Sequence, residues 1–123
     1  MKGDKIRSAE ASRLRQRKHQ LARRFDIPDH LLPGSLSEVH YRCGKPNCHC
    51  ATGERHAAWT LTFMVEGRKR VERIPPEWVD EVRERVQAGR QFQDAVRDVL
   101  AANAQLLALE RRQLREQRKR NKR

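Results

Sequence analysis

The stretch Cys43-Gly44-Lys45-Pro46-Asn47-Cys48-His49-Cys50 contains all three cysteines of the 123-residue chain, and His56 follows it closely. Gly, Pro and Asn favour turns, so the residues between the cysteines predict a tight turn that brings the thiols together. Thiolates and an imidazole in one short segment are typical of a metal site, for which zinc is the first candidate. We expect Cys43, Cys48, Cys50 and His56 to be the ligands, with His40 and His49 in reserve.

Other interpretations of the cysteines fit less well. A disulfide would leave one cysteine over, and a bond between Cys48 and Cys50 would be strained. A nucleophilic Cys/His pair needs only one thiol, and inert buried thiols do not suit such polar surroundings. Four protein ligands close a zinc shell, and Glu54 is the one carboxylate inside the segment. The sequence therefore predicts a structural site, and we do not expect an enzyme.

Composition limits the size of the packed core. Aromatic residues make up 5% of the chain and charged residues 36%, so the core is small and a bound metal would help to stabilise it. No apolar run approaches the roughly 20 residues of a membrane span. The N-terminus carries no apolar signal segment, and cysteines kept reduced for metal binding are typical of the cytosol. These features predict a cytoplasmic protein without a membrane partner.

Charge is concentrated at the two ends of the chain. Residues 1–25 contain nine Lys/Arg and two Asp/Glu, residues 26–110 contain eleven and thirteen, and residues 111–123 contain eight and one. Two cationic arms around a near-neutral centre favour a nucleic acid, DNA or RNA, as partner, although they would also keep a small protein in solution. The residues that we expect to contact it are Arg13, Arg15, Arg17, Lys18, Arg23, Arg24, Lys45, Arg68, Lys69, Arg70, Arg111, Arg112, Arg115, Arg118, Lys119 and Arg120.

The periodicity of the chain predicts an α+β fold, in which an N-terminal helix and a long C-terminal helix flank a small three-stranded antiparallel sheet with the Cys/His turn. We expect a basic helical arm over residues 1–25, whose helix starts near residue 4 with Asp4 as its cap. A linker over 26–35 leads into a β module over 36–75, with strands at 36–42, 59–65 and 68–74. An amphipathic helix over 76–114 and a frayed basic tail over 115–123 complete the chain.

Two registers are open for the hairpin at Glu66-Gly67. A two-residue loop would place Val71 opposite Thr62, and a three-residue loop would place it opposite Leu61. We expect the second register, because it brings Val71 to the same face as Leu61.

The C-terminal helix has a heptad-like seam. Val96, Asn103 and Glu110 occupy one position of the seam, and Leu100, Leu107 and Leu114 occupy the other. This pattern favours pairing with a second copy or with a larger protein through residues 96–114. Packing of the same residues on the N-terminal helix is an alternative.

The cysteine stretch, followed by Gly53, His56, an aromatic strand and the helix start Ile74-Pro75-Pro76, resembles an uncharacterised bacterial and archaeal domain family that has the signature CGKPxCxC…G…HGPY. The resemblance covers about residues 36–110 and implies a small zinc-ribbon-like module, encoded near transposases, without an established activity. The chain departs from the signature at Ala57-Ala58-Trp59, which leaves every candidate ligand in place. The basic arms are expected to lie outside the family region.

Together these observations predict a zinc-stapled accessory protein that binds nucleic acid electrostatically and is linked to a mobile element. The alternative is a helix-mediated interaction module that partners a recombinase or transposase.

Overall fold

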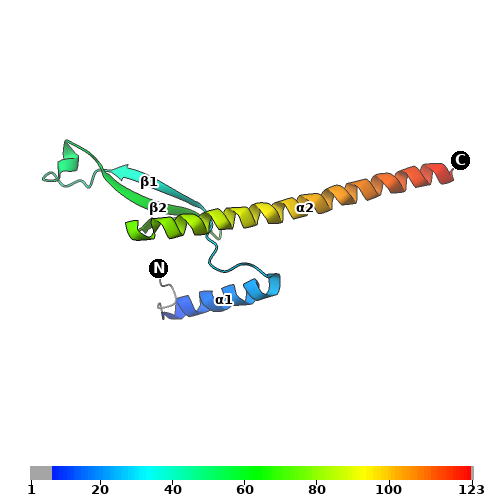
Figure 1. Cartoon of the computed structure of the whole chain (residues 1–123), viewed down its shortest axis with the longest axis horizontal. Coiled ribbons are helices and arrows are strands. Elements are labelled where there is room, and N and C mark those ends of the chain that lie inside the picture. Colours follow the sequence, from blue (N-terminus) through cyan, green and yellow to red (C-terminus); the bar gives the residue numbers. More distant parts are fainter. Residues whose placement is uncertain (1–6, 123) are drawn as a thin grey trace. The chain divides into compact units, whose positions relative to one another are not determined.

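The computed structural model describes residues 7–122 and confirms the predicted α+β architecture (Figure 1). The chain divides into two compact units, one ending at Ala88 and one beginning at Gly89. In chain order the elements are α1 (Ala9–Phe25), β1 (Ser35–Tyr41), the 3-10 turn η2 (His49–Ala51), β2 (His56–Val65), β3 (Arg68–Ile74), the 3-10 turn η3 (Pro76–Trp78) and α2 (Val79–Asn121).

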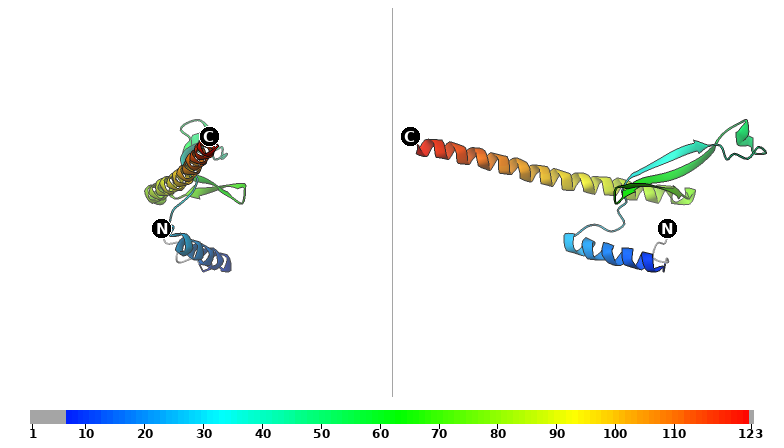
Figure 2. Two further views of the ribbon diagram at one scale, coloured as in Figure 1. Left: turned by 90° about the vertical axis from the view of Figure 1, so that its right-hand side faces the viewer. Right: turned by 180° about the vertical axis from the view of Figure 1, so that it is seen from behind.

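The three strands form one antiparallel sheet in the order β1-β2-β3. The central strand β2 begins at His56, three residues before the predicted start, because its first residues pair with β1 as far as Tyr41. Its later residues pair with β3, from Trp59 opposite Ile74 to Val65 opposite Arg68. The segment with the cysteines therefore connects the two paired ends of β1 and β2, and it lies beyond them in Figures 1 and 2.

The expected hairpin register was wrong. Val71 pairs with Thr62, not with Leu61, so the loop between β2 and β3 has two residues. Glu66 and Gly67 have φ values of 51° and 78°, the pair of positive angles that a type I′ turn requires. This turn matches the twist of the two strands, and that local geometry outweighed the burial of Val71, which stays 54% exposed.

The core lies between one face of the sheet and the first turns of α2. Leu61, Val82 and Val86 form its buried centre, and Leu32, Leu36, Phe63 and Ile74 pack against them. Leu32 is also held by its backbone N–H, which donates to the carbonyl oxygen of Arg85 at 3.1 Å. Each buried aliphatic side chain contributes roughly 1.5–3 kcal/mol. A core of this size agrees with the low aromatic content.

The helix α1 starts later than expected. Ser8 is its N-cap, with a side-chain oxygen that accepts a hydrogen bond from the backbone N–H of Ala11 at 3.1 Å. The cap proposed from the sequence, Asp4, lies outside the described residues. At the other end Asp26 adopts a left-handed conformation, with φ 53°, and ends the helix two residues before Pro28.

The helix α2 is longer than expected. It runs without interruption through Gly89 and past residue 114 to Asn121, so most of the expected frayed tail is helical. Arg118, Lys119 and Arg120 occupy its last turn, where positive charge is favourable next to the exposed carbonyl groups. Within residues 7–122, no helix combines the length and the apolar character needed to cross a membrane.

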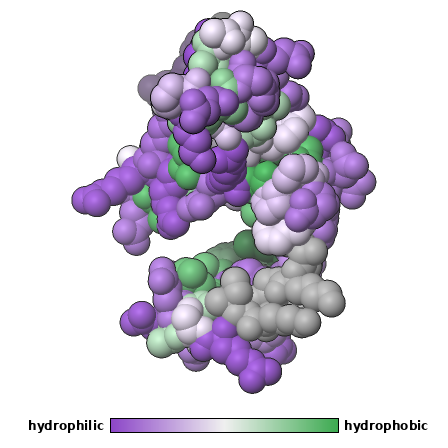
Figure 3. Space-filling model, turned by 90° about the vertical axis from the view of Figure 1, so that its left-hand side faces the viewer, coloured by the Kyte–Doolittle hydropathy of each residue, from purple (hydrophilic) through white to green (hydrophobic). Residues whose placement is uncertain are grey.

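Apolar side chains are also exposed along the second half of α2. Val99, Leu100, Leu106 and Leu107 are each about 60% exposed. In a space-filling view, hydrophilic residues cover most of the visible surface and hydrophobic ones show between them (Figure 3).

Candidate metal centre and basic surfaces

The structure brings the four predicted metal ligands together. The ligand atoms of Cys43, Cys48, Cys50 and His56 all lie within 4.8 Å of one another. Cys43 Sγ is 3.5 Å from Cys50 Sγ, and Cys48 Sγ is 3.1 Å from His56 Nε2. Around a tetrahedral zinc ion, sulfur atoms lie about 3.8 Å apart, and sulfur and nitrogen about 3.6 Å apart. Three thiols and an imidazole at this spacing could bind a metal ion.

Each candidate ligand lies in a different local structure. Cys43 follows the end of β1 by two residues, and Gly44, with φ 80°, reverses the chain after it. The backbone N–H of Cys48 donates to the carbonyl oxygen of Lys45 at 3.1 Å and closes the turn. Cys50 is the middle residue of η2, and His56 is the first residue of β2. Two of the four candidate ligands, Cys43 and His56, therefore lie next to or at the ends of strands of the sheet.

Hydrogen bonds around the cluster hold the turn in place. The Arg42 guanidinium donates to the carbonyl oxygens of Cys50 and Ala51, the latter at 2.9 Å. The backbone N–H of Cys43 points at Cys50 Sγ at 3.4 Å. Cys50 is only 1% exposed, so water does not reach its sulfur. The backbone N–H of Cys43 therefore supplies a hydrogen-bond donor that water cannot. Donors of this kind to ligand atoms orient a metal site and tune its affinity.

The cysteines of the cluster differ in acidity. A hydrogen bond from the backbone N–H of Lys45 lowers the pKa of the Cys43 thiol to about 7, and the contact with Cys50 acts in the same direction. At Cys50 the backbone N–H of Cys43 favours the thiolate, but burial and the neighbouring thiols outweigh it, so the pKa of Cys50 is raised. The Cys43 thiol therefore ionises more easily than the Cys50 thiol.

The two reserve histidines are placed differently. His40 lies outside the cluster and its Nε2 is 3.4 Å from a carboxylate oxygen of Glu38. His49 lies beside the cluster, with its Nδ1 3.8 Å from Cys48 Sγ. Its ring is edge-on to the ring of His56, and the two ring centroids are 5.2 Å apart. His49 is thus a neighbour of two of the candidate ligands, Cys48 and His56.

The basic residues predicted to contact nucleic acid fall in four places. Six lie on α1, Lys45 lies in the cysteine turn, three lie on β3, and six lie in the last part of α2. On α1, Lys18 forms a 3.0 Å ion pair with Asp29. On β3, Arg70 pairs with Glu72 at 3.1 Å. Because side chains alternate along a strand, Lys69 lies on the opposite side of the sheet from Arg68 and Arg70.

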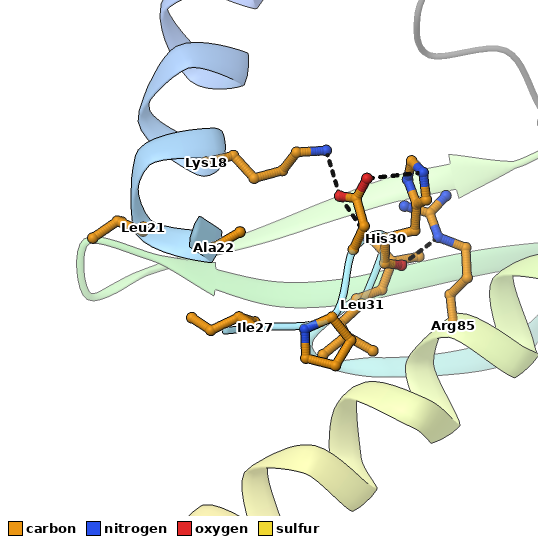
Figure 4. A pocket seen from close by; sticks show the side chains of 10 residues that line it. Lys18, Leu21, Ala22, Ile27, His30, Leu31 and Arg85 are labelled. Atoms are coloured by element: carbon orange, nitrogen blue, oxygen red, sulfur yellow. Dashed lines mark hydrogen bonds and ion pairs between the residues drawn. The ribbon is translucent and has the colours of Figure 1, made fainter. Parts of the chain in front are cut away.

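A pocket of about 420 Å³ lies where the linker meets α1 and α2, and the sequence did not point to it (Figure 4). Arg85 Nε donates to the carbonyl oxygen of His30 at 2.6 Å. The hydrogen bond from Lys18 lowers the pKa of Asp29, as does the backbone N–H of His30. These contacts anchor the linker, which explains how Leu32 reaches the core.

A second feature that the sequence did not indicate joins β1 to β3 across β2. The Arg73 guanidinium donates to the Tyr41 hydroxyl oxygen at 2.6 Å and lies 5.1 Å from the centre of its ring. The Tyr41 ring is in turn 5.5 Å from that of His56. Only the register of the sheet places these residues together.

A family model described as a domain of unknown function (DUF6788) matches residues 8–84. The match confirms the resemblance to an uncharacterised small domain family. It begins at residue 8, so residues 8–25 of the first basic arm belong to the family region, contrary to expectation, and it ends at residue 84 rather than near residue 110. No curated protein and no solved structure matches the chain.

Proposed function

This chain belongs to the DUF6788 family, and we propose that it is a zinc-stapled accessory protein that binds nucleic acid in the cytoplasm. The observation that carries the proposal is the distribution of charge. Residues 1–25 and 111–123 contain seventeen Lys/Arg and three Asp/Glu, and the region between them contains eleven and thirteen. Cations so strongly sorted to two segments favour a polyanionic partner.

Zinc would have a structural role in this protein. The core has few buried residues, and the cysteine segment has its own three-residue 3-10 turn as its sole regular structure. Three thiolates and one imidazole form a closed shell around zinc, which leaves no open position for a substrate. Cysteines that bind zinc must also stay reduced, which needs a reducing compartment. This supports a cytoplasmic location.

Binding through the arms would be mainly electrostatic. Lys and Arg that neutralise phosphates release bound counterions, so the affinity falls steeply with salt. The six arm cations on α2 are spread along and around consecutive turns of a helix, so they do not converge on one base edge. We therefore expect weak sequence preference.

A salt series tests this proposal. Fluorescence anisotropy with a labelled duplex and a labelled single strand gives the dissociation constant at each salt concentration. The logarithm of the association constant should fall linearly with the logarithm of the salt concentration. The slope should be about −0.9 for each phosphate neutralised on duplex DNA.

Two double variants on the same helix separate arm cations from other cations. Arg111→Gln with Arg112→Gln removes two charges from the arm, and should weaken binding and reduce the salt slope. Arg83→Gln with Arg97→Gln removes two arginines that are paired with Asp80 and Asp94 at 3.0 and 3.5 Å, and should have little effect. Equal effects of the two variants, or binding that does not respond to salt, would reject the electrostatic account.

The exposed seam of α2 supports a second candidate function, self-association or docking on a recombinase or transposase. Leu100 and Leu107 are 63% and 61% exposed. Burial of this stripe against a partner helix would remove it from water, and Asn103 would select one pairing.

Light scattering tests self-association. Leu100→Lys with Leu107→Lys should dissociate a dimer, whereas Gln105→Lys, on the opposite side of the helix, should not; a monomeric parent protein would exclude self-pairing.

A further inference from the structure

The sheet has one face that the core does not use. Residues paired across an antiparallel sheet point to the same side, and neighbours along a strand point to opposite sides. Because Leu36, Leu61 and Ile74 contact the core, the alternate residues face away from it. This outer face consists of Ser35, Ser37, Val39 and Tyr41 of β1, His56, Ala58, Thr60, Thr62 and Met64 of β2, and Lys69, Val71 and Arg73 of β3.

The two faces of the sheet differ in charge. The outer face, all of whose residues the structure describes, contains Lys69 and Arg73 and no carboxylate. The strand carboxylates, Glu38 and Glu72, pair with Trp59 and Leu61 and therefore lie on the core side. There Glu72 neutralises Arg70. The outer face is consequently cationic, and its positive charges have no acidic neighbour on the same surface.

The centre of the outer face is a shallow, mainly apolar depression of about 260 Å³. It is lined by Val39, Tyr41, Ala58, Thr60, Val71 and Arg73. Val71 is 54% exposed and Val39 is 39% exposed, so apolar surface faces solvent on both sides of Thr60. The Arg73 guanidinium packs on the Tyr41 ring and fixes its hydroxyl group. A flat aromatic and guanidinium surface with cations beside it has the chemistry of a base-stacking platform.

We propose that the outer face binds single-stranded nucleic acid, with an unpaired base stacked against the Tyr41–Arg73 pair and the adjacent phosphates held by Lys69 and Arg73. The proposal rests on the proposed nucleic-acid function and names the form of nucleic acid that this surface recognises. A single strand exposes the faces of its bases, whereas a duplex covers them with neighbouring pairs. A duplex can therefore use the cations of the outer face but not its apolar centre.

A second copy of the chain fits this face less well. A two-fold contact would bring Lys69 and Arg73 of both copies onto one shared surface, and neither copy supplies a carboxylate there. Like charges that lose their water without a partner oppose association. The absence of carboxylates instead matches a strand of phosphates.

Substitutions of Tyr41 test the stacking contact in the protein purified with Zn²⁺. Tyr41→Leu keeps an apolar side chain but removes the ring, and should weaken single-strand binding by about 5- to 100-fold. Duplex binding should change by less than about twofold, since a duplex offers no base face to the ring. Tyr41→Phe keeps the ring and should retain most of the single-strand affinity.

Two substitutions on opposite sides of β3 provide a matched control. Arg73→Gln and Arg70→Gln remove the same charge from the same strand, but Arg73 is on the outer face and Arg70 is on the core side. Arg73→Gln should weaken single-strand binding several times more than Arg70→Gln. Because Tyr41 contacts His56, the zinc content and melting temperature of each variant are measured alongside binding.

Photocrosslinking of the unaltered protein avoids any effect of substitution on folding. A single strand that carries 5-iodouracil should crosslink to Tyr41, the only tyrosine of the chain, which mass spectrometry identifies. Crosslinks confined to the basic arms, with salt-dependent binding that Tyr41→Leu leaves unchanged, would overturn the platform while the proposed function stands. Absence of nucleic-acid binding would overturn both. A dimer that Val71→Lys dissociates would assign this face to a second copy instead.

Discussion

Cys48 Sγ and His56 Nε2 lie 3.1 Å apart, although one residue belongs to the cysteine turn and the other opens β2. The same strand β2 carries Leu61 into the core five residues later. An ion bound by both side chains would therefore connect the turn directly to the packed sheet. We expect metal binding and the folding of this region to be coupled.

Loss of a ligand tests the metal centre. Cys48→Ser should raise the dissociation constant for Zn²⁺ by more than about 100-fold, since a ligand contributes more than the residues that merely orient it. His40→Ala removes a histidine from the same region that lies outside the cluster, and should leave the affinity unchanged. Competition with a chromophoric chelator measures both constants. Equal affinities of Cys48→Ser and the parent protein would show that Cys48 is not a ligand.

Zinc affinity should rise with pH. The metal binds thiolates, so it must displace protons from thiols that are still protonated. The pKa of Cys43 is lowered to about 7 and that of Cys50 is raised, so Cys50 still holds its proton where Cys43 has lost its own. Between about pH 7 and pH 9 the affinity should increase at least about tenfold per pH unit because of Cys50, and more steeply below pH 7. Zinc titrations across this range would measure the slope, and a flat profile would contradict thiolate ligation.

Gly34 is predicted to be essential for the start of β1. It has φ 90°, and a Cβ atom added there would lie 2.0 Å from the carbonyl oxygen of Thr62. Gly34→Ala should therefore destabilise the protein by about 2–4 kcal/mol. Gly67 also has a positive φ, of 78°, but a Cβ atom there meets nothing within 4 Å. Gly67→Asn, which suits a left-handed turn position, should cost much less in urea unfolding followed by circular dichroism, and similar losses would contradict the close approach at Gly34.

The small core makes Val82 a sensitive position. Val82 is 2% exposed in the centre of the core, so Val82→Ala should lower the free energy of unfolding by about 2 kcal/mol. Val99 is on the same helix but is 60% exposed, so Val99→Ala should change it by less than about 0.5 kcal/mol. Thermal unfolding of the two variants gives the comparison. A loss at Val99 as large as that at Val82 would indicate that the exposed stripe of α2 is buried in the unaltered protein.

Local chemistry made much of this fold predictable from the sequence. The four candidate ligands share one turn-rich segment of fourteen residues, and the bounds of β3 agree with the expected strand. The register of the hairpin was not predicted, because it depends on the backbone angles of Glu66 and Gly67 rather than on the hydrophobicity of Val71. The helix start was missed by a few residues because Asp4 and Ser8 are both good caps in sequence.

Long-range features could not be read in the same way. Tyr41 and Arg73 are 32 positions apart, and their contact exists only when both registers of the sheet are known. The clash that constrains Gly34 likewise depends on where Thr62 lies in space. The sequence therefore located the candidate metal centre but not the cationic outer face, because the first is a local arrangement and the second is a product of strand pairing.

The two-residue loop at Glu66-Gly67 has an evolutionary consequence. One added or deleted codon at this tip would turn β3 over, so that Glu72 and Arg70 replaced Val71 and Arg73 on the side turned away from α2. The cysteine segment would be untouched by such an indel, since it joins β1 to β2. Lineages that keep the candidate metal ligands but alter the length of this tip would therefore be expected to lose the Tyr41–Arg73 pair without losing the candidate metal centre.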